Sequence, residues 1–293
     1  MAAGDTITQS LADSLDTVVA SARQIREQEG VMPNLVDKVP LEEGTGTSWR
    51  EISMAQLTAQ AITETTRLDN PQQMSDTAFA ITPTVVGIQT LITDRVAARV
   101  NKKSYAQLGS LAQNAIQRKK DEDGLAVIDG ATTQLNTANA ALASGFIAAA
   151  VYQISSNVTE PGNPPFRAVF HGFSLKDIWD ELTAAVDTAE RSDISGITAR
   201  VFTEGLRGKI AGCEIYEDGN LTIDDDGDAK GGVFAQEAIV LVQGRSPRTA
   251  TIRREDIGGG ATVMYLYDEY AYGERSAGNW LYEIIADATA PTS

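Results

Sequence analysis

The first part of the chain has an amphipathic pattern. Between Thr6 and Glu29 the apolar positions alternate at spacings of four and three residues: Leu11, Leu15, Val18, Ala22 and Ile25. This narrow apolar seam predicts one helix, which ends near Gly30 and Pro33. Such a seam is typical of a helix that packs against a partner helix. Packing on the chain's own domain explains the pattern equally well, and both interpretations stay open.

A second, extended pattern covers Val39 to Ile92. The stretch from Thr47 to Leu68 is rich in Thr, Gln and β-branched residues and has no sustained helical period. Asp69-Asn70-Pro71 is a turn signal, and an extended run resumes at Phe79, in which Pro83 favours an edge position. The pattern predicts a long hairpin with two fairly polar faces. An isolated hairpin is marginal in water, so we expect it to lie across a neighbouring subunit; a loose surface hairpin is the alternative.

Helical patterns dominate the next stretch. A short helix is predicted over Asp94 to Val100, and the longest helix from Ser104 to about Val127, with a capping-box pair in Ser104 and Gln107. A third helix is predicted over Thr133 to Ile154. One face of that third helix would carry the apolar residues Leu135, Ala138, Leu142, Phe146 and Ala149.

The C-terminal half reads mainly as strands. Phe166 to His171 predicts a buried strand, and Ser174 is expected to cap a helix over Leu175 to Ala189. Asp224 to Gly232 is an acidic, glycine-rich loop. The remaining strands are predicted around Ile210, Cys213 and Ile215, and over Ala238–Val242, Thr249–Arg254, Ala261–Tyr272 and Asn279–Ala286. The last two would form a hairpin through Gly273 to Gly278. The fold class is therefore α+β, with a C-terminal antiparallel sheet.

Composition narrows the possible functions. The 293 residues carry 24 Lys and Arg against 40 Asp and Glu, a formal net charge of −16. So acidic a surface repels phosphate, which argues against sequence-specific nucleic-acid binding and against anionic membranes. One Cys and one His exclude a disulfide framework and a Cys/His zinc site within one chain. Met1 to Ser10 does not resemble a signal peptide, so we expect intracellular synthesis.

Candidate chemistry is sparse. His171, the single histidine, follows an apolar strand, and no Gly-x-Ser-x-Gly motif is present. Acidic neighbours raise the pKa of a thiol, so Cys213 is expected to be a buried small hydrophobe. The acidic run beginning at Asp224 would place Thr222 and Val233 at two positions where a calcium loop needs ligands. We therefore expect no catalytic, cofactor-binding or metal-binding residues, although a pair of carboxylates among the 40 acids stays possible.

The order of these parts resembles the major capsid proteins of tailed bacteriophages, which have the Hong Kong 97 type capsid fold. The resemblance rests on an arm, an extended loop and a long helix that ends in Asp123-Gly124-Leu125-Ala126-Val127-Ile128-Asp129-Gly130. After these come a strand, turn and helix from Ala168 to Leu175, and the stretch from Gly208 to Ile215 ahead of Asn220-Leu221. A C-terminal stretch from Gly232 to Asp287 completes the order.

This resemblance implies a domain organisation and a function. The expected parts are an N-terminal arm (1–40), an extended loop (41–86), a peripheral domain with the spine helix (87–165), an axial domain (166–242) and strands returning to the peripheral domain (243–293). It implies a structural protein, not an enzyme. Hexamers and pentamers would form an icosahedral shell around phage genomic DNA. The runner-up is an encapsulin-like nanocompartment that encloses cargo enzymes, and a carboxylate-based enzyme is a distant third.

The same resemblance suggests partners and contact residues. The expected location is the virion capsid, after assembly in the host cytoplasm. The partners would be further copies of the chain, a separate scaffolding protein, a portal, packaged DNA without sequence-specific contacts and a possible decoration protein. The candidate contacts between subunits are Leu11, Leu15, Val18 and Ile25 in the arm, Trp49, Arg50, Glu64 and Arg67 in the hairpin, and Arg118, Lys119 and Lys120 on the spine helix.

Two departures from the family are informative. Some members cross-link their shells through a lysine in the extended loop. Here no lysine occurs between Lys38 and Lys102, so no such isopeptide bond is expected. Other members begin with a scaffolding segment that a protease removes. Because this sequence starts near the arm, a separate scaffolding protein is expected.

Overall fold

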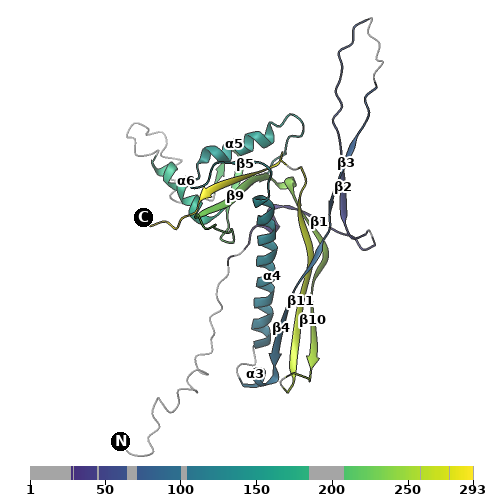
Figure 1. Ribbon diagram of the computed structural model, residues 1–293, viewed down its shortest axis with the longest axis vertical. Helices are drawn as coiled ribbons and strands as arrows, with labels where there is room; N and C mark the ends of the chain where they lie inside the picture. The colour runs from purple at the N-terminus through teal and green to yellow at the C-terminus, as the bar shows by residue number, and fades with distance from the viewer. Residues whose placement is uncertain are drawn as a thin grey trace, which may run out of the picture. The chain divides into compact units, whose positions relative to one another are not determined.

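The computed structural model describes residues 28, 30–44, 46–64, 71–99, 104–184, 208–257, 259–276 and 278–292 (Figure 1). The chain divides into two compact units. The first contains residues 1–28, 86–117 and 247–268, and the second contains residues 29–85, 118–246 and 269–293. The amphipathic helix predicted from Thr6 onward lies outside the described residues.

The first unit is built on strands and helices that the sequence patterns predicted well. It takes all or part of β4 (Thr84–Thr93), α3 (Asp94–Arg99), α4 (Ser104–Asp129), β10 (Ile239–Arg254) and β11 (Ala261–Glu274). The Asp94 carboxylate accepts a hydrogen bond from Arg253 Nη1 at 2.6 Å, and the Asp94 N–H donates to the Gly260 carbonyl at 2.9 Å. The turn between β10 and β11 is thereby tied to the start of α3. The predicted short and long helices are confirmed to within about two residues.

Three sheets organise the strands. A four-stranded sheet has the order β1-β10-β11-β4, with β1 (Asp37–Pro40) parallel to β10. A two-stranded hairpin pairs β2 (Trp49–Met54) with β3 (Asp76–Ile81). The third sheet has the order β5-β12-β9-β6-β8-β7; its strands are β5 (Gln134–Leu135), β6 (Phe166–Phe170), β7 (Lys209–Ile210), β8 (Cys213–Glu217), β9 (Asp228–Ala235) and β12 (Leu281–Asp287).

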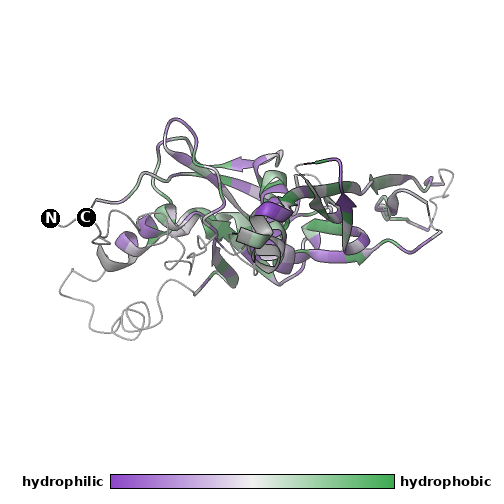
Figure 2. Ribbon diagram, turned by 90° about the horizontal axis from the view of Figure 1, so that it is seen from below, coloured by the Kyte–Doolittle hydropathy of each residue, from purple (hydrophilic) through white to green (hydrophobic). Residues whose placement is uncertain are grey.

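The six-stranded sheet forms the core of the second unit, together with α5 (Ser144–Ser155), α6 (Gly172–Ala184) and the C-terminal part of α4. Its inner strands β9 and β12 are buried almost throughout. A Cβ at Gly232 in β9 would lie 2.6 Å from Ile128 Cγ2 and 2.8 Å from the Tyr282 carbonyl oxygen. Only glycine lets α4 pack so closely on the sheet. Figure 2 shows that hydrophobic and hydrophilic residues interchange along both helices and strands.

The helix predicted from Thr133 to Ile154 begins about ten residues later, at Ser144. Asn136 and Asn139 both have a positive φ, 67° and 59°, which is incompatible with a continuous α-helix. Leu135 instead lies in β5, which pairs in parallel with β12. The helix is confirmed from Ser144 onward, but its buried residues are Ile147, Ala150, Val151 and Ile154, and the predicted Phe146 and Ala149 are only partly buried. Tertiary pairing decided the first part. The residues 136–143 form the turn that connects β5 to α5.

The C-terminal strands also differ from the prediction. The separate strands expected over Ala238–Val242 and Thr249–Arg254 form one strand, β10, and half of the expected acidic loop forms β9. Gly273 to Gly278 joins no hairpin, because β11 and β12 belong to different sheets. The sheets are mixed: β1 with β10, β6 with β8 and β5 with β12 are parallel pairs, so a purely antiparallel sheet was wrong.

A smaller correction concerns Ser174, which was expected to cap its helix. The helix α6 already begins at Gly172, and Ser174 is buried within its first turn. The preceding β6 ends at Phe170, as the apolar run predicted. None of the helices among the described residues combines the length and the apolar run needed to cross a lipid bilayer.

Candidate assembly surface

The hairpin of β2 and β3 has two faces of different character. Register places Trp49 beside Ile81, Glu51 beside Phe79 and Ser53 beside Thr77 on one face. Because side chains alternate across a strand, the partners in between form the other face. These are the pairs Arg50 with Ala80, Ile52 with Ala78, and Met54 with Asp76.

The first face anchors the hairpin to the body of the second unit. Ile81 is 5% exposed and belongs to a hydrophobic cluster with Val240 and Val242 of β10. The Trp49 ring packs against this cluster and meets Phe79 edge to face, with ring centroids 6.2 Å apart. The base of the hairpin is therefore part of a hydrophobic core and not a loose appendage.

A single arginine joins the hairpin to three other segments. Arg275 Nε donates to Glu51 Oε2 at 2.7 Å, Nη1 donates to the Glu237 carbonyl oxygen at 2.8 Å and Nη2 donates to Asp37 Oδ2 at 3.1 Å. Its guanidinium also lies over the Trp49 ring, 5.9 Å from the centroid. The side chain is 17% exposed, so these contacts are shielded more than those of a surface ion pair.

The second face is exposed although it is apolar. Ile52 is 60% exposed and Met54 is 70% exposed. Beyond the paired strands, the hairpin adds three more exposed large hydrophobic side chains, which are Leu57, Ile62 and Met74. Polar contacts hold this outer part together: the Thr58 N–H donates to Gln72 Oε1 at 2.8 Å, and the Ala55 N–H donates to the Ser75 carbonyl at 2.9 Å. The hairpin thus exposes several large hydrophobic side chains on a scaffold that hydrogen bonds hold together.

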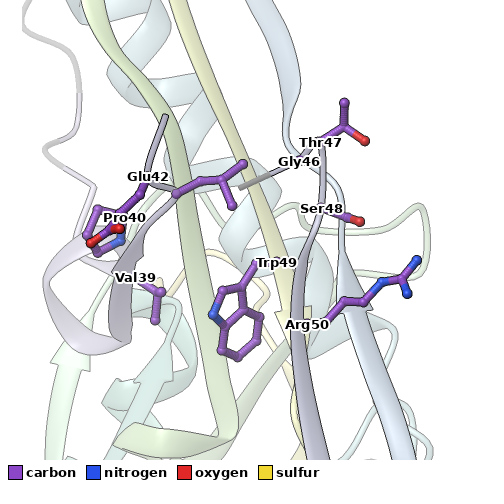
Figure 3. A pocket seen from close by; sticks show the side chains of 9 residues that line it. Val39, Pro40, Glu42, Gly46, Thr47, Ser48, Trp49 and Arg50 are labelled. Carbon is purple, nitrogen blue, oxygen red and sulfur yellow. The ribbon is translucent and has the colours of Figure 1, made fainter. Parts of the chain in front are cut away.

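A pocket of about 690 Å³ lies at the base of the hairpin, between β1, the following loop and the start of β2 (Figure 3). Figure 3 shows the Trp49 and Val39 side chains on the same side, whereas Arg50 points away from them. Trp49 and Arg50 were both predicted to contact a second copy, but the structure places their side chains on opposite faces of the hairpin. Trp49 serves the internal anchor, and Arg50 is on the exposed face.

The structure locates some of the other predicted contact residues. Glu64 is exposed in the outer part of the hairpin. Arg67, Leu11, Leu15, Val18 and Ile25 lie outside the described residues. Contacts of all these residues with a second copy stay predictions. Arg275 and Phe79 carry the anchor but were not singled out, because no local pattern marks a contact between residues so far apart in the sequence.

The three basic residues of the spine helix have partners within the same unit. Arg118 pairs with Glu122 at 3.6 Å, and Lys119 pairs with Asp123, each one helical turn apart. Lys120 is only 7% exposed; its Nζ donates to Gln243 Oε1 at 2.5 Å. Of the three, Arg118 and Lys119 keep exposed surface that a second copy could reach.

The residues considered for catalysis are in unreactive surroundings. Burial raises the pKa of the Cys213 thiol to about 12, and the neighbouring Glu214 carboxylate adds to the shift. Burial lowers the pKa of His171, although Glu217 opposes this, and its Nδ1 accepts a hydrogen bond from the Phe173 N–H at 3.2 Å. A thiol with so high a pKa is almost entirely protonated at neutral pH and is a poor nucleophile.

The acidic loop is held by its own hydrogen bonds. Asp224 Oδ1 accepts the N–H of Asp226 at 3.0 Å and the N–H of Asp228 at 2.8 Å. Gly227, with φ of 92°, completes the turn. Over the described residues, no group of three or more His, Cys, Asp and Glu side chains is arranged to hold a metal ion.

Comparison with known proteins gives matches in structure alone. No family model matches the sequence, and no curated protein matches it. A solved structure described as the head structure of Helicobacter pylori bacteriophage KHP40 matches with a TM-score of 0.73 at 11% identity, over 98% of this chain and 100% of that one. The capsid structure of the cyanophage P-SCSP1u matches with a TM-score of 0.71 at 14% identity, over 98% and 97%.

A chain described as Mycobacterium phage Che8 matches with a TM-score of 0.70 at 18% identity, over 89% of this chain and 93% of that one. All three likenesses extend over nearly the whole length of both chains. Identities this low establish the fold and not the function. The chain is similar in structure to the capsid chains of bacteriophages, and its mixed α+β fold is theirs.

Proposed function

We propose that this chain is the major capsid protein of a tailed bacteriophage, with a capsid fold of the Hong Kong 97 type. The observation that carries the proposal is the likeness to phage head and capsid structures over 98% of the chain, with TM-scores above 0.7. Copies of the chain would form hexamers and pentamers that close into an icosahedral shell around genomic DNA. The role is structural and not catalytic.

The hairpin supports this role. Burying one exposed aliphatic or Met side chain stabilises a contact by about 1.5–3 kcal/mol, whereas association costs about 4–15 kcal/mol. Five such side chains on one hairpin leave only a small surplus for a single pair of copies. Contacts of this strength become stable when each copy makes several of them within a closed assembly. An anchored hairpin with an exposed apolar face suits a shell better than it suits a free monomer.

The proposed parts follow the domain boundaries expected from the sequence: an arm (1–40), an extended loop (41–86), a peripheral domain (87–165), an axial domain (166–242) and returning strands (243–293). The extended loop would coincide with the hairpin of β2 and β3, and the spine helix with α4. Further proposed partners are a scaffolding protein, a portal, a decoration protein and DNA bound without sequence preference. Assembly would take place in the host cytoplasm and end in the virion capsid.

Electron microscopy tests the proposal. The full-length chain would be expressed alone and together with its neighbouring genes, and both preparations would be imaged after size separation. Closed shells or capsomer-sized rings are expected. Nuclease-protected DNA in native particles would distinguish a phage capsid from an encapsulin-like compartment. The likeness to the phage structures named above does not favour the encapsulin-like compartment. Monodisperse monomers in both preparations would overturn the proposal.

A further inference from the structure

Two aspartates from distant parts of the chain meet in the interior of the second unit. Asp121 of α4 is 0% exposed, and Asp218, which directly follows β8, is 1% exposed. Asp121 Oδ1 accepts a hydrogen bond from the Met32 N–H at 2.9 Å. Asp218 Oδ2 accepts one from the Val31 N–H at 3.3 Å. Two consecutive backbone amides are therefore held by two different buried carboxyl groups.

Asn220 connects the two aspartates. Its backbone N–H donates to Asp218 Oδ1 at 2.9 Å, and its side-chain Nδ2 donates to Asp121 Oδ2 at 2.9 Å. Both carboxyl groups thus contact the same asparagine and two consecutive backbone amides. Two carboxyl groups buried this close to one another resist ionising together, which favours a pair that carries one proton.

The chain passes this pair at close range. A Cβ added to Gly30 would lie 2.3 Å from Asp121 Cγ, so a larger residue would collide with the carboxyl group. The three residues from Gly30 to Met32 contribute no titratable side chain. The two aspartates hold the backbone of this segment through the Val31 and Met32 amides, and the buried Met32 side chain packs against α4 at Gly124.

The charged groups around the pair are mostly acidic. The adjoining Glu122 of α4 and Glu217 of β8 are acids, and His171 follows β6, whose Phe170 carbonyl accepts the Asp218 N–H at 3.0 Å. The nearest lysine in sequence, Lys120, donates to Gln243 instead. The ion pairs found in the described residues include neither aspartate.

Burial raises the pKa of Asp218 to about 7, and the adjacent Asp121 carboxyl contributes to the rise, whereas the backbone N–H of Asn220 opposes it. A carboxyl group in low dielectric next to a second carboxyl resists ionisation in this way. The geometry of the pair and its protonation therefore agree.

We propose that Asp121 and Asp218 form a one-proton latch that holds the chain at Val31 and Met32 against α4. In the closed state one carboxyl O–H donates to the other carboxylate, and a single negative charge is buried. When the O–H bond breaks, the proton passes to water and two buried carboxylates face each other without a cation. The hydrogen bonds to the Val31 and Met32 amides then open, and water solvates both charges.

The direction of the pH effect follows from linkage. A carboxyl pKa that is raised in the folded state stabilises that state fully below the ordinary aspartate pKa. This stabilisation is lost as the pH rises through the folded value of about 7. The latch is therefore held most firmly in mild acid, weakens as the pH rises toward 7 and gains nothing further from this proton in mild alkali.

Hydrogen exchange of the unassembled full-length chain tests the latch between pH 4.5 and 8.5. The protection factors of the Val31 and Met32 amides, corrected for intrinsic exchange, are expected to fall by up to about tenfold per pH unit from acid to about neutral pH and to level off above it, because the closed state holds one more proton than the open state only in that range. In Asp218→Asn the side chain cannot lose a proton, so the profile should be flat. Glu181→Gln is the matched control, because Glu181 also accepts a backbone N–H, that of Ser144 at 2.7 Å, but is exposed; it should keep the wild-type profile.

A second measurement does not depend on any variant. Carboxyl ¹³C chemical shifts of the wild-type chain should show one aspartate that titrates near neutral pH. Flat protection in the wild type, an equal fall in Asp218→Asn, or the absence of a carboxyl group that titrates between pH 6 and 8 would each overturn the latch. The readouts concern the free subunit, so the result is independent of whether the chain forms shells.

Discussion

Arg275 Nε lies 2.7 Å from Glu51 Oε2, a contact between residues separated by 224 positions in the sequence. Through this contact, the residue that directly follows β11 holds β2, the first strand of the hairpin. The same guanidinium reaches Asp37 and the Glu237 carbonyl, so one side chain supplements the hydrophobic anchor of the hairpin with three hydrogen bonds.

Replacing this arginine tests how the hairpin is held. Arg275→Lys keeps the charge but cannot make the three directed hydrogen bonds, so the free energy of unfolding is expected to fall by about 1–3 kcal/mol. Shells formed with this variant should be fewer or irregular. Urea unfolding and microscopy measure the two effects. Arg254→Lys, which alters an exposed pair with Asp256, should change stability by less than about 0.5 kcal/mol. Equal effects of the two changes would contradict the special role of Arg275.

The exposed face of the hairpin is expected to matter for assembly but not for folding. Ile52→Asp and Met54→Asp place a charge on side chains that are 60% and 70% exposed, so the melting temperature should stay within about 2 °C of the wild type. Buried in a contact between copies, the same charge would be strongly unfavourable, and shells should be lost. Val158→Asp is a suitable control, since Val158 is 92% exposed and lies away from the hairpin. Normal shells from both hairpin variants would rule out this face as a contact.

Shortening the hairpin separates its two functions. Removing the whole stretch from Glu43 to Pro83 would delete Ile81 and Trp49 from the hydrophobic cluster and damage the fold. Replacing residues 56–74 by a short turn keeps both paired strands. We expect this variant to unfold like the wild type and to form no shells. A large loss of stability on calorimetry would mean that the outer part also supports the core.

Because the hairpin contains no lysine, we predict shells without isopeptide links from the hairpin. With no lysine between Lys38 and Lys102, an isopeptide bond from this region cannot form. Shells boiled in detergent should therefore run as monomers on a denaturing gel. A ladder of multimers that survives boiling would disprove this expectation.

Two glycines offer a matched test of local packing. Gly30→Ala would force a methyl group to within 2.3 Å of Asp121 Cγ, so we expect a loss of more than about 1 kcal/mol in stability. Gly145→Ala adds a methyl group where nothing lies within 4 Å, at the start of α5, and should be neutral or stabilise by up to about 1 kcal/mol. Thermal unfolding of both variants decides the matter, and a similar loss in both would show that close packing at Gly30 is unimportant.

The sequence predicted long, locally determined elements well and tertiary relationships poorly. The helical spacing from Leu108 to Ile116 predicted α4, and the apolar run at Phe166 predicted β6. Both elements could be predicted because their conformation is determined by residues that are close together in the sequence. β5 was mistaken for helix because its extended conformation comes from pairing with β12, about 150 residues later. The sites could be predicted only in part for the same reason. The extended character of the hairpin was visible, but its faces were expected to be fairly polar, whereas one packs on the core through Trp49 and Ile81 and the other exposes Ile52 and Met54. The Arg275 anchor and the Asp121–Asp218 pair depend on contacts between distant segments.

The central position of β12 has a consequence for synthesis. This strand lies between β5 and β9, yet it is the last of the described strands to leave the ribosome. Long-range pairings of this kind close slowly and leave strand edges exposed until they form. A nascent chain therefore cannot complete the six-stranded sheet before β12 has emerged from the ribosome. Until then, β5 and β9 lack the strand that lies between them.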